Sequence, residues 1–361
     1  MLLTGIYPPI TTPFYPDGSI YFKKLEHNVT RYSKTPVSGI VVLGSTGEAL
    51  MLSDDEKRDI FKCAIESAAP EKVMIAGTGV ESAVETLRLT DYAAKLDYDI
   101  AMVRTPHYYK RQCEPENMLA FYRFVADRSA LPVVIYNFPP STGYDIPAEV
   151  VLELAEHPNV VGIKESSGVI EKVQQMVEKT RHIERKATVT ERFEAVTGRM
   201  LKHASAVKAE ELVPAAALAG ASGGASTATA KPSSSAVKVV GNLKTREKNV
   251  GFQVLVGSAQ KLNPSLQVGA VGAILAFADA APTACYEIYA AFKDGDAKLA
   301  EEKQQRIVKA ASRIVGELSV PGVKYAMELN GYYGGNGRLP LLPLTAEKKA
   351  EIEQLMANIK S

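Results

Sequence analysis

VVGIKESSG, from Val160 to Gly168, has the pattern of a buried strand that ends in a lysine. Val160, Val161 and Ile163 are β-branched, and a short apolar run bounded by glycine and serine is typical of a strand covered on both faces. Lys164 follows them, where a buried ammonium group costs free energy unless it is paired or neutral. Lys164 is therefore either an ion-paired structural side chain or an amine nucleophile that attacks a carbonyl group.

The same strand pattern recurs along the chain and indicates the fold class. Strand-like runs alternate with helix-like segments at intervals of roughly 30 residues, as β-α units do. The runs are GIYPPI (5–10), GIVVLG (39–44), KVMIAGTG (72–79), IAMVRTP (100–106), LPVVIYNFPP (131–140), NVVGIKESSG (159–168), GFQVLVGS (251–258) and VGAILAFAD (271–279). This alternation predicts an α/β protein, a (β/α)8 TIM barrel. An open doubly wound sheet is the alternative, although no G-x-G-x-x-G follows the first strand.

The regular spacing breaks once, between strands six and seven. It predicts an insertion at about residues 180–248, with a helical first half (188–213). The second half, AAALAGASGGASTATAKPSSSA (215–236), has almost no large apolar residue and is predicted to be a flexible linker. Because a helix-to-strand connection lies opposite the active-site face of a barrel, we expect the insertion there. The barrel is expected over residues 1–280 and a C-terminal helical region over 281–361.

Composition argues against several classes of protein. Lysine and arginine total 42 against 41 acidic residues, so no basic or acidic excess indicates nucleic acid or a membrane surface. No apolar run approaches the roughly 20 residues of a bilayer span, and the N-terminus lacks a signal-peptide pattern. We therefore expect a cytoplasmic protein. Cys63, Cys113 and Cys285 fit no disulfide or zinc pattern, and the five histidines form no ligand cluster, so no metal is expected.

The strand ends supply the candidate chemistry, since active sites of TIM barrels lie at the C-terminal ends of their strands. These ends carry Thr11, the turn at 44–47, Tyr136, Lys164 and Gly257. A neutral lysine forms an iminium ion with a ketone, a tyrosine moves protons, and the hydroxyls and N–H groups of a turn hold a carboxylate. Taken singly, each residue also has a structural interpretation, such as a packed tyrosine or an ordinary capped turn.

Four motifs in this order resemble those of the dihydrodipicolinate synthase / N-acetylneuraminate lyase family. They are GSTGEAL (44–50), TPHYY (105–109), YNFPPSTG (136–143) and GIKESSG (162–168), and ITTPF (10–14) and GRLPLLPL (337–344) are similar to the family's ends. The resemblance covers nearly the whole chain except about residues 180–248. It implies a (β/α)8 barrel with C-terminal helices, a Schiff base with pyruvate, no cofactor, and a homo-oligomer, either a dimer or a tetramer.

The resemblance also implies roles for individual residues. Lys164 matches the Schiff-base lysine, and Tyr136 matches the general acid/base. Ser45 and Thr46, which follow Gly44, match the pair that binds the carboxylate of the 2-oxo acid, and Ser45 also relays protons to Tyr136. Catalysis then explains why a lysine is tolerated here, because its working states are a neutral amine and an imine paired with a substrate carboxylate.

Two positions bear on partners and substrate. Tyr108 matches the family tyrosine that reaches into a neighbouring subunit's site, or Tyr109 does if the motif is shifted by one residue. Ser141 stands where dihydrodipicolinate synthases usually carry an arginine that holds the carboxylate of aspartate semialdehyde. Serine cannot offer a charged bidentate fork.

Ser141 therefore argues against aspartate semialdehyde as the partner. The combination of TPHYYK (105–110), YNFPPSTG and KESSG (164–168) most resembles aldolases of 4-hydroxy-2-oxo acids, which implies a retro-aldol lyase that releases pyruvate and an aldehyde. The alternative is a synthase that condenses pyruvate with aspartate semialdehyde. A barrel that only binds a ligand is disfavoured because Lys164, Tyr136 and the Ser45–Thr46 pair, each dispensable for folding, are all retained. A metal-dependent aldolase is disfavoured because no cluster of ligands is present.

Overall fold

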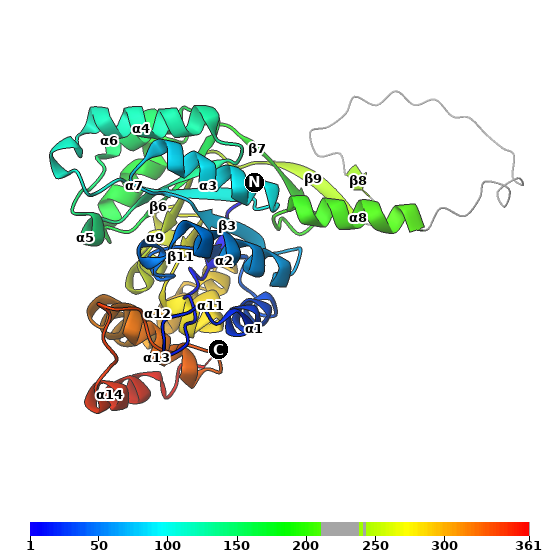
Figure 1. Cartoon of the computed structure of the whole chain (residues 1–361). Coiled ribbons are helices and arrows are strands. Elements are labelled where there is room, and N and C mark those ends of the chain that lie inside the picture. The colour runs from blue at the N-terminus through cyan, green and yellow to red at the C-terminus, as the bar shows by residue number, and fades with distance from the viewer. Residues whose placement is uncertain (211–237, 241–242, 361) are drawn as a thin grey trace, which may run out of the picture.

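A ring of eight parallel strands forms the centre of the protein (Figure 1). The computed structural model describes residues 1–210, 238–240 and 243–360. The strands follow the order β1-β11-β10-β6-β5-β4-β3-β2. The ring closes between β1 and β2, because Val41 N donates to Pro8 O and Ile10 N donates to Val41 O, both at 3.0 Å. The predicted (β/α)8 barrel is confirmed.

Each predicted run forms one strand of the barrel. The bounds are β1 Gly5–Tyr7, β2 Gly39–Val42, β3 Val73–Gly77, β4 Ile100–Arg104, β5 Val133–Asn137, β6 Val160–Glu165, β10 Gln253–Val256 and β11 Gly272–Ile274. The strands are almost completely buried, as expected for a parallel sheet with helices outside and packed side chains inside. Every second strand residue points inward, and Val41, Ile75, Met102, Val134 and Leu255 fill the interior.

Helices surround the ring, as alternation with the strands predicts. They are α1 Phe22–Ser33, α2 Asp54–Ser67, α3 Ala83–Lys95, α4 Pro115–Arg128, α6 Ala148–Ala155, α7 Ile170–Lys179, α9 Leu262–Gln267 and α11 Pro282–Lys293, with short helices α5 Pro139–Thr142 and α10 Phe277–Ala280. The start of α2 is fixed by a capping box. Ser53 Oγ accepts from Glu56 N at 3.2 Å, and Ser53 N donates to Glu56 Oε2 at 2.9 Å.

The described part of the insertion contains a second, antiparallel sheet. Its elements are β7 Lys186–Thr190, α8 Gly198–Glu210, β8 Lys238–Val240 and β9 Leu243–Asn249, with strand order β7-β9-β8. The helix predicted from residue 188 is therefore wrong in its first part. Ala187 and Val189 alternate with polar residues and bury against Leu2, so a two-residue period selects a strand. The linker predicted at 215–236 lies outside the described residues.

This insertion contacts the N-terminal ends of the barrel strands. Arg199 in α8 donates to Ala68 O at 3.3 Å, and Lys202 pairs with Asp97 at 2.6 Å. These two partners lie in the loops that precede β3 and β4. The described part of the insertion is therefore on the face opposite the end of β6 that carries Lys164, as expected from its place in the chain.

The C-terminal helices are α12 Ala297–Ala311, α13 Ser319–Leu329 and α14 Ala346–Met356, with a π-helical turn at Ser312–Glu317 between the first two. They gather on one side of the barrel (Figure 1). One of them reaches a strand end, because Lys324 in α13 pairs with Glu48 after β2 at 2.5 Å.

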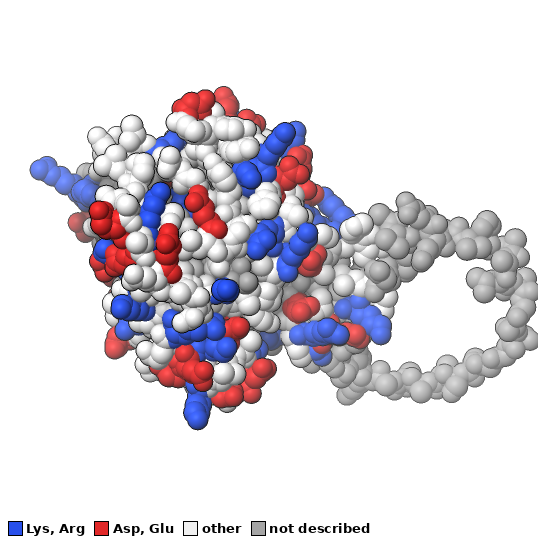
Figure 2. All heavy atoms as spheres, turned by 90° about the horizontal axis from the view of Figure 1, so that it is seen from below, with Lys and Arg blue, Asp and Glu red and all other residues white. Residues whose placement is uncertain are grey.

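The surface carries both signs of charge. On the face drawn in Figure 2, lysine and arginine are interspersed with aspartate and glutamate. Within the described residues, no helix is long and apolar enough to cross a membrane.

Candidate active site

Three neighbouring strands bring polar side chains to one level of the barrel. Arg104 at the end of β4 pairs in register with Tyr136 of β5, which pairs with Lys164 of β6. In a parallel sheet, residues paired in this way point to the same face. All three are buried, with exposed fractions of 9%, 4% and 5%. The C-terminal mouth of the barrel therefore holds a guanidinium group, a phenol and an amine side by side.

These side chains line a cavity of about 290 Å³. Its wall also includes Ser45, Thr46, Glu48, His107, Phe138, Ser141, Ser166 and Gly257, and the C-terminal region adds Val315, Ser319 and Val323. A cavity of this size and depth suits a small organic molecule. The predicted site residues Lys164, Tyr136, Ser45, Thr46, Ser141 and Gly257 are thus brought together around one space.

Lys164 has no carboxylate partner among the residues that the structure describes. The carboxylate of the adjacent Glu165 accepts from Asn137 Nδ2 at 2.9 Å and lies 3.4 Å from Lys172 Nζ. In the part of the chain that the structure describes, no carboxylate oxygen lies within 4.0 Å of Lys164 Nζ. The amine instead lies 4.0 Å from the centroid of the Tyr136 ring. Lys164 is thus not an ion-paired structural lysine.

Asp279 is a second buried carboxyl group that interacts electrostatically with Lys164. Its side chain is fully buried, and burial raises its pKa well above the usual range, against the opposing effect of Lys164. Neither carboxyl oxygen of Asp279 has a hydrogen-bond partner among the described residues.

Tyr136 and Ser45 form a hydroxyl pair beside the amine. Ser45 Oγ lies 3.3 Å from Tyr136 Oη, and either oxygen can donate. The pair connects β5 to the turn after β2. Such a pair can pass a proton between a substrate and the turn.

The turn at 44–48 leaves donors free. Gly47 N donates to Gly44 O and Glu48 N donates to Ser45 O, both at 3.1 Å. The backbone N–H groups of Ser45 and Thr46 have no acceptor within the described residues. Two consecutive N–H groups and two hydroxyls are suited to a carboxylate.

A buried ion pair fixes this turn. Glu48 adopts a left-handed conformation (φ 57°), and its Oε1 lies 2.5 Å from Lys324 Nζ. Both side chains are completely buried, and Lys324 also donates to Thr12 O at 2.8 Å. Burial lowers the pKa of Lys324, whereas Glu48 raises it. Because α13 carries Lys324, the C-terminal region holds the turn that contains Ser45 and Thr46.

Three predicted site residues lie elsewhere. The Thr11 hydroxyl donates to Met327 Sδ at 3.3 Å, and Thr11 does not line the cavity. Gly44 lines a smaller neighbouring pocket together with Ser45 and Arg104. Tyr108 is 74% exposed and does not line the cavity of its own chain.

Position 257, in the cavity wall, has room only for glycine. A Cβ at this position would lie 1.9 Å from Ser166 Oγ, so no side chain fits. The backbone of Gly257 therefore packs against Ser166, and both residues line the cavity together with Lys164.

Sequence reasoning missed Arg104 and His107. In IAMVRTP an arginine follows the apolar residues, as a lysine does in VVGIKESSG, so the signal that singled out Lys164 was present at Arg104 as well. His107 carried no such signal, because its contact with Glu81 depends on how the loop after β4 folds. No group of three or more His, Cys, Asp or Glu side chains that could hold a metal ion occurs in the described ranges.

A (β/α)8 barrel with a buried lysine beside a tyrosine at its C-terminal mouth is the architecture of Schiff-base-forming carbon–carbon lyases. The sequence profile of the Dihydrodipicolinate synthetase family matches residues 2–231 and 227–359. The chain belongs to this family of class I aldolases.

Relatives and solved structures carry related names. The 4-hydroxy-tetrahydrodipicolinate synthase of Methanothrix thermoacetophila is 29% identical over 358 residues, 99% of this chain and 97% of the relative. The enzyme of that name from Xanthomonas campestris is 40% identical over 177 residues, 49% of this chain and 58% of the relative. Dihydrodipicolinate synthase from Bacillus anthracis superposes with a TM-score of 0.76 at 24% identity, covering 99% of this chain and 98% of that one. These names favour the synthase alternative over the retro-aldol interpretation.

Proposed function

We propose that the protein forms a Schiff base with pyruvate through Lys164 and condenses it with aspartate semialdehyde, the activity of a 4-hydroxy-tetrahydrodipicolinate synthase. The observation that carries the proposal is the buried Lys164 amine, which faces a small cavity and has no carboxylate partner in the described part of the chain. Family membership supports the chemistry, and the names of the relatives support the product. A prophage protein of the family from E. coli K12 is described in complex with pyruvate; it superposes with a TM-score of 0.75 at 25% identity, covering 99% of each chain.

The reaction starts at the ketone carbon of pyruvate. Lys164 Nζ forms a C–N bond to it and gives up a proton, so that the ketone oxygen becomes a carbinolamine hydroxyl. A second proton from the general acid lets this hydroxyl leave as water, which gives the iminium ion. Loss of a proton from the methyl carbon gives an enamine, which forms a C–C bond to the aldehyde carbon. Tyr136 donates and accepts these protons, with Ser45 3.3 Å away as the relay. Hydrolysis of the imine, or attack on it by the amine of the condensed aldehyde, frees Lys164.

The substrate carboxylate occupies the turn after β2. The N–H groups of Ser45 and Thr46 lack acceptors within the described residues, and both side chains line the cavity. A carboxylate there lies beside the positively charged iminium of Lys164. The pairing stabilises the charge of the intermediate in a site of low dielectric.

A retro-aldol reaction on a 4-hydroxy-2-oxo acid is the second candidate. Ser141 favours it, because this uncharged side chain lines the cavity where a synthase usually presents an arginine. Both candidates share the pyruvate half of the reaction and differ only in the aldehyde.

We further infer that the protein works as a homo-oligomer, a dimer or a tetramer. Tyr108 and Tyr109 project from the loop after β4 with exposed fractions of 74% and 67%, and their rings pack edge to face 5.2 Å apart. Large exposed aromatic side chains are typical of protein interfaces. In the proposed assembly, Tyr108 enters the cavity of a second copy. Light scattering of the wild type and of Tyr108→Ala tests this inference, and a monomeric wild type would contradict it.

Two assays separate the candidate functions. Wild-type protein is given pyruvate with aspartate semialdehyde, and separately 4-hydroxy-2-oxoglutarate, and the products are identified by mass spectrometry. The synthase proposal predicts that the first pair is consumed faster and that the second compound is cleaved weakly or not at all. Faster release of pyruvate from the second compound would favour the retro-aldol candidate instead.

A further inference from the structure

Arg104 is a buried cation whose hydrogen-bonding capacity is largely unused. It lies at the end of β4, lines the cavity, and is only 9% exposed. Its Nε and Nη2 atoms have no hydrogen-bond partner among the residues that the structure describes. A guanidinium group remains charged in proteins, and a buried charge without hydrogen bonds is costly. An unsatisfied arginine in the wall of a cavity is therefore expected to bind an anionic ligand.

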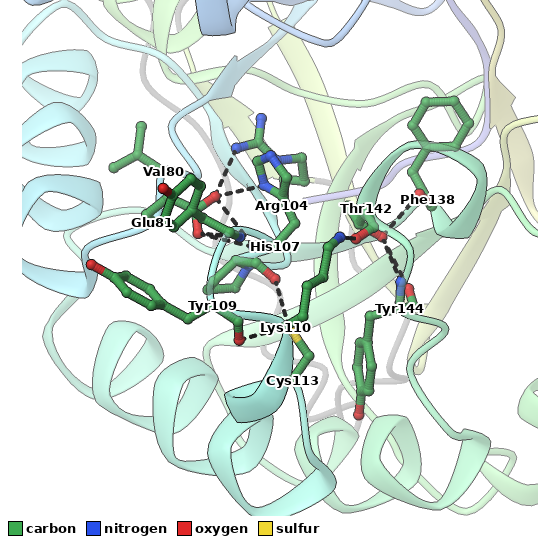
Figure 3. A network of polar contacts seen from close by, with 12 residues as sticks. Val80, Glu81, Arg104, His107, Tyr109, Lys110, Cys113, Phe138, Thr142 and Tyr144 are labelled. Atoms are coloured by element: carbon green, nitrogen blue, oxygen red, sulfur yellow. Dashed lines mark hydrogen bonds and ion pairs between the residues drawn. The ribbon is translucent and has the colours of Figure 1, made fainter.

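The nearest carboxylate does not satisfy Arg104. Glu81 Oε1 lies 3.8 Å from Arg104 Nη2, which is beyond hydrogen-bond distance. Figure 3 shows Glu81 between Arg104 and the loop after β4, with dashed lines to both. It accepts from His107 N at 2.9 Å and from Tyr108 N at 3.0 Å, and it contacts His107 Nδ1 at 2.6 Å. Glu81 therefore holds this loop and leaves the guanidinium group of Arg104 available.

The unused donors of Arg104 are left for a second anion. Glu48 is paired with Lys324 at 2.5 Å, and Glu81 lies 3.8 Å from Arg104 Nη2, which offsets the charge of Arg104 without accepting a hydrogen bond from it. Once the iminium of Lys164 is paired with the carboxylate of pyruvate, the N–H groups of Arg104 remain for a second carboxylate.

The position of Arg104 fits a group at the far end of the substrate from the imine. Arg104 and Lys164 lie on either side of Tyr136 at one level, and their backbones are two strands apart, about 10 Å. Ser141 lines the same cavity but offers no charge. Arg104 is thus a cation in the wall that can compensate for the serine.

We propose that Arg104 is the specificity-determining residue for the aldehyde partner and binds its carboxylate, so that the partner is an aldehyde acid rather than a neutral aldehyde. This inference rests on the proposed Schiff-base chemistry, but it holds for either candidate reaction. The planar guanidinium group binds the carboxylate through two parallel N–H···O bonds. No covalent step passes through Arg104.

Charge-matched pairs of aldehydes test the proposal. The enamine formed from pyruvate is offered 4-oxobutanoate or its uncharged counterpart 4-oxobutanamide, and glyoxylate or glycolaldehyde, and kcat and KM are measured for each. The variant is Arg104→Gln. The control Arg88→Gln removes the same charge from α3, where Arg88 is exposed and pairs with Glu85. All proteins are also treated with pyruvate and borohydride, and the adduct is quantified by intact mass.

The proposal predicts a selective loss of activity. In Arg104→Gln, kcat/KM for the anionic aldehydes falls about 10- to 100-fold, mainly through KM, because a charge-assisted hydrogen bond is lost. The values for the neutral aldehydes and the yield of pyruvate adduct stay within about twofold of wild type. Arg88→Gln matches wild type throughout. Equal losses for both kinds of aldehyde, or no loss, would overturn the proposal and leave Arg104 a structural role near Glu81.

Two further measurements keep the test decisive. If Arg104→Gln does not fold, Arg104→Lys retains the charge without the bidentate geometry and is expected to show an intermediate loss. Wild-type protein alone must prefer at least one anionic aldehyde over its neutral counterpart by about tenfold or more. Equal use of both would refute the role of Arg104 without any variant. Absence of a pyruvate adduct on the wild type would instead refute the proposed function.

Discussion

Lys164 Nζ lies 4.0 Å from the centroid of the Tyr136 ring, and the two residues are paired on the adjacent strands β5 and β6. The amine of Lys164 therefore lies over the ring face of Tyr136, while the hydroxyl of Tyr136 is 3.3 Å from Ser45 Oγ. The hydroxyl of Tyr136 contacts Ser45 Oγ, so Tyr136 can transfer protons to and from substrate atoms without being hydrogen-bonded to the Lys164 amine. This arrangement separates nucleophile and proton carrier, and it leads to the first two predictions.

Tyr136→Phe is expected to retain the imine but lose turnover. The ring that contacts Lys164 remains, whereas the proton carrier is gone, so kcat falls about 10²- to 10³-fold. Borohydride trapping of pyruvate, given long incubation, measures imine formation, and a steady-state assay measures turnover. Turnover within about fivefold of wild type would show that another group carries the proton.

Ser45→Ala is expected to lower turnover by interrupting proton transfer to Tyr136. Its effect on turnover should be large in the wild-type background and small in Tyr136→Phe, because residues in one hydrogen-bonded chain are not additive. A double-mutant cycle on kcat measures this coupling. Thr46→Ser serves as the control, because it keeps the hydroxyl of the neighbouring residue. Fully additive effects of Ser45 and Tyr136 would contradict a relay.

Removing one partner of the Glu48–Lys324 ion pair should destabilise the protein more than removing both partners. Lys324→Met leaves Glu48 as an uncompensated buried charge and is expected to lower the free energy of unfolding by about 3 to 5 kcal/mol. Adding Glu48→Gln should recover much of the loss. Urea unfolding of the single and double variants measures both effects. A double variant that is no more stable than Lys324→Met would mean that packing, not charge, dominates.

The Glu56–Arg338 contact should contribute acid-sensitive stability. Hydrogen bonds from Arg338 lower the pKa of Glu56 from 4.5 to about 2, against the opposing effect of burial. As pH falls below 4.5, the unfolded chain binds the proton first, so this stabilisation is present above pH 4.5 and is lost progressively down to about pH 2. Glu56→Gln should therefore show a shallower loss of unfolding free energy across that interval. Parallel pH profiles of the two proteins would refute the linkage.

Removal of the insertion tip is expected to leave the chemistry intact. Replacing residues 204–239 with a short Gly/Ser linker keeps Arg199 and Lys202, which contact the N-terminal face of the barrel. Because that face is opposite Lys164, pyruvate trapping should remain within about twofold of wild type. Loss of trapping in a shortened protein with an unchanged circular dichroism spectrum would indicate that the insertion contributes to the site.

The barrel could be predicted because short apolar runs alternate with helix-like segments at intervals of roughly 30 residues, the spacing of β-α units. The secondary-structure prediction failed at Lys186–Thr190. This segment is a short strand because Val189 is buried against Leu2. Thr11 was misplaced for a similar reason, because its hydroxyl partner, Met327, is 316 residues away in the chain. Contacts of such separation depend on tertiary packing, and local patterns do not encode them.

The sequence predicted those site residues whose chemical type is unusual for their position, such as a lysine at the end of a buried strand. Lys164 and Tyr136 stand at strand ends within recognisable motifs, and the structure places them in one cavity. The part of the wall that Val315 and Val323 supply could not be predicted, since it depends on how the C-terminal helices return to the barrel.

Borohydride trapping tests whether Lys164 forms a Schiff base with pyruvate. Wild-type protein and Lys164→Arg are incubated with pyruvate and borohydride, their intact masses are measured, and the modified residue is located by peptide mapping. We expect an irreversible gain of one reduced pyruvate on Lys164 in the wild type and none in a folded Lys164→Arg. A folded wild-type protein without an adduct, or with the adduct on another lysine, would contradict this expectation.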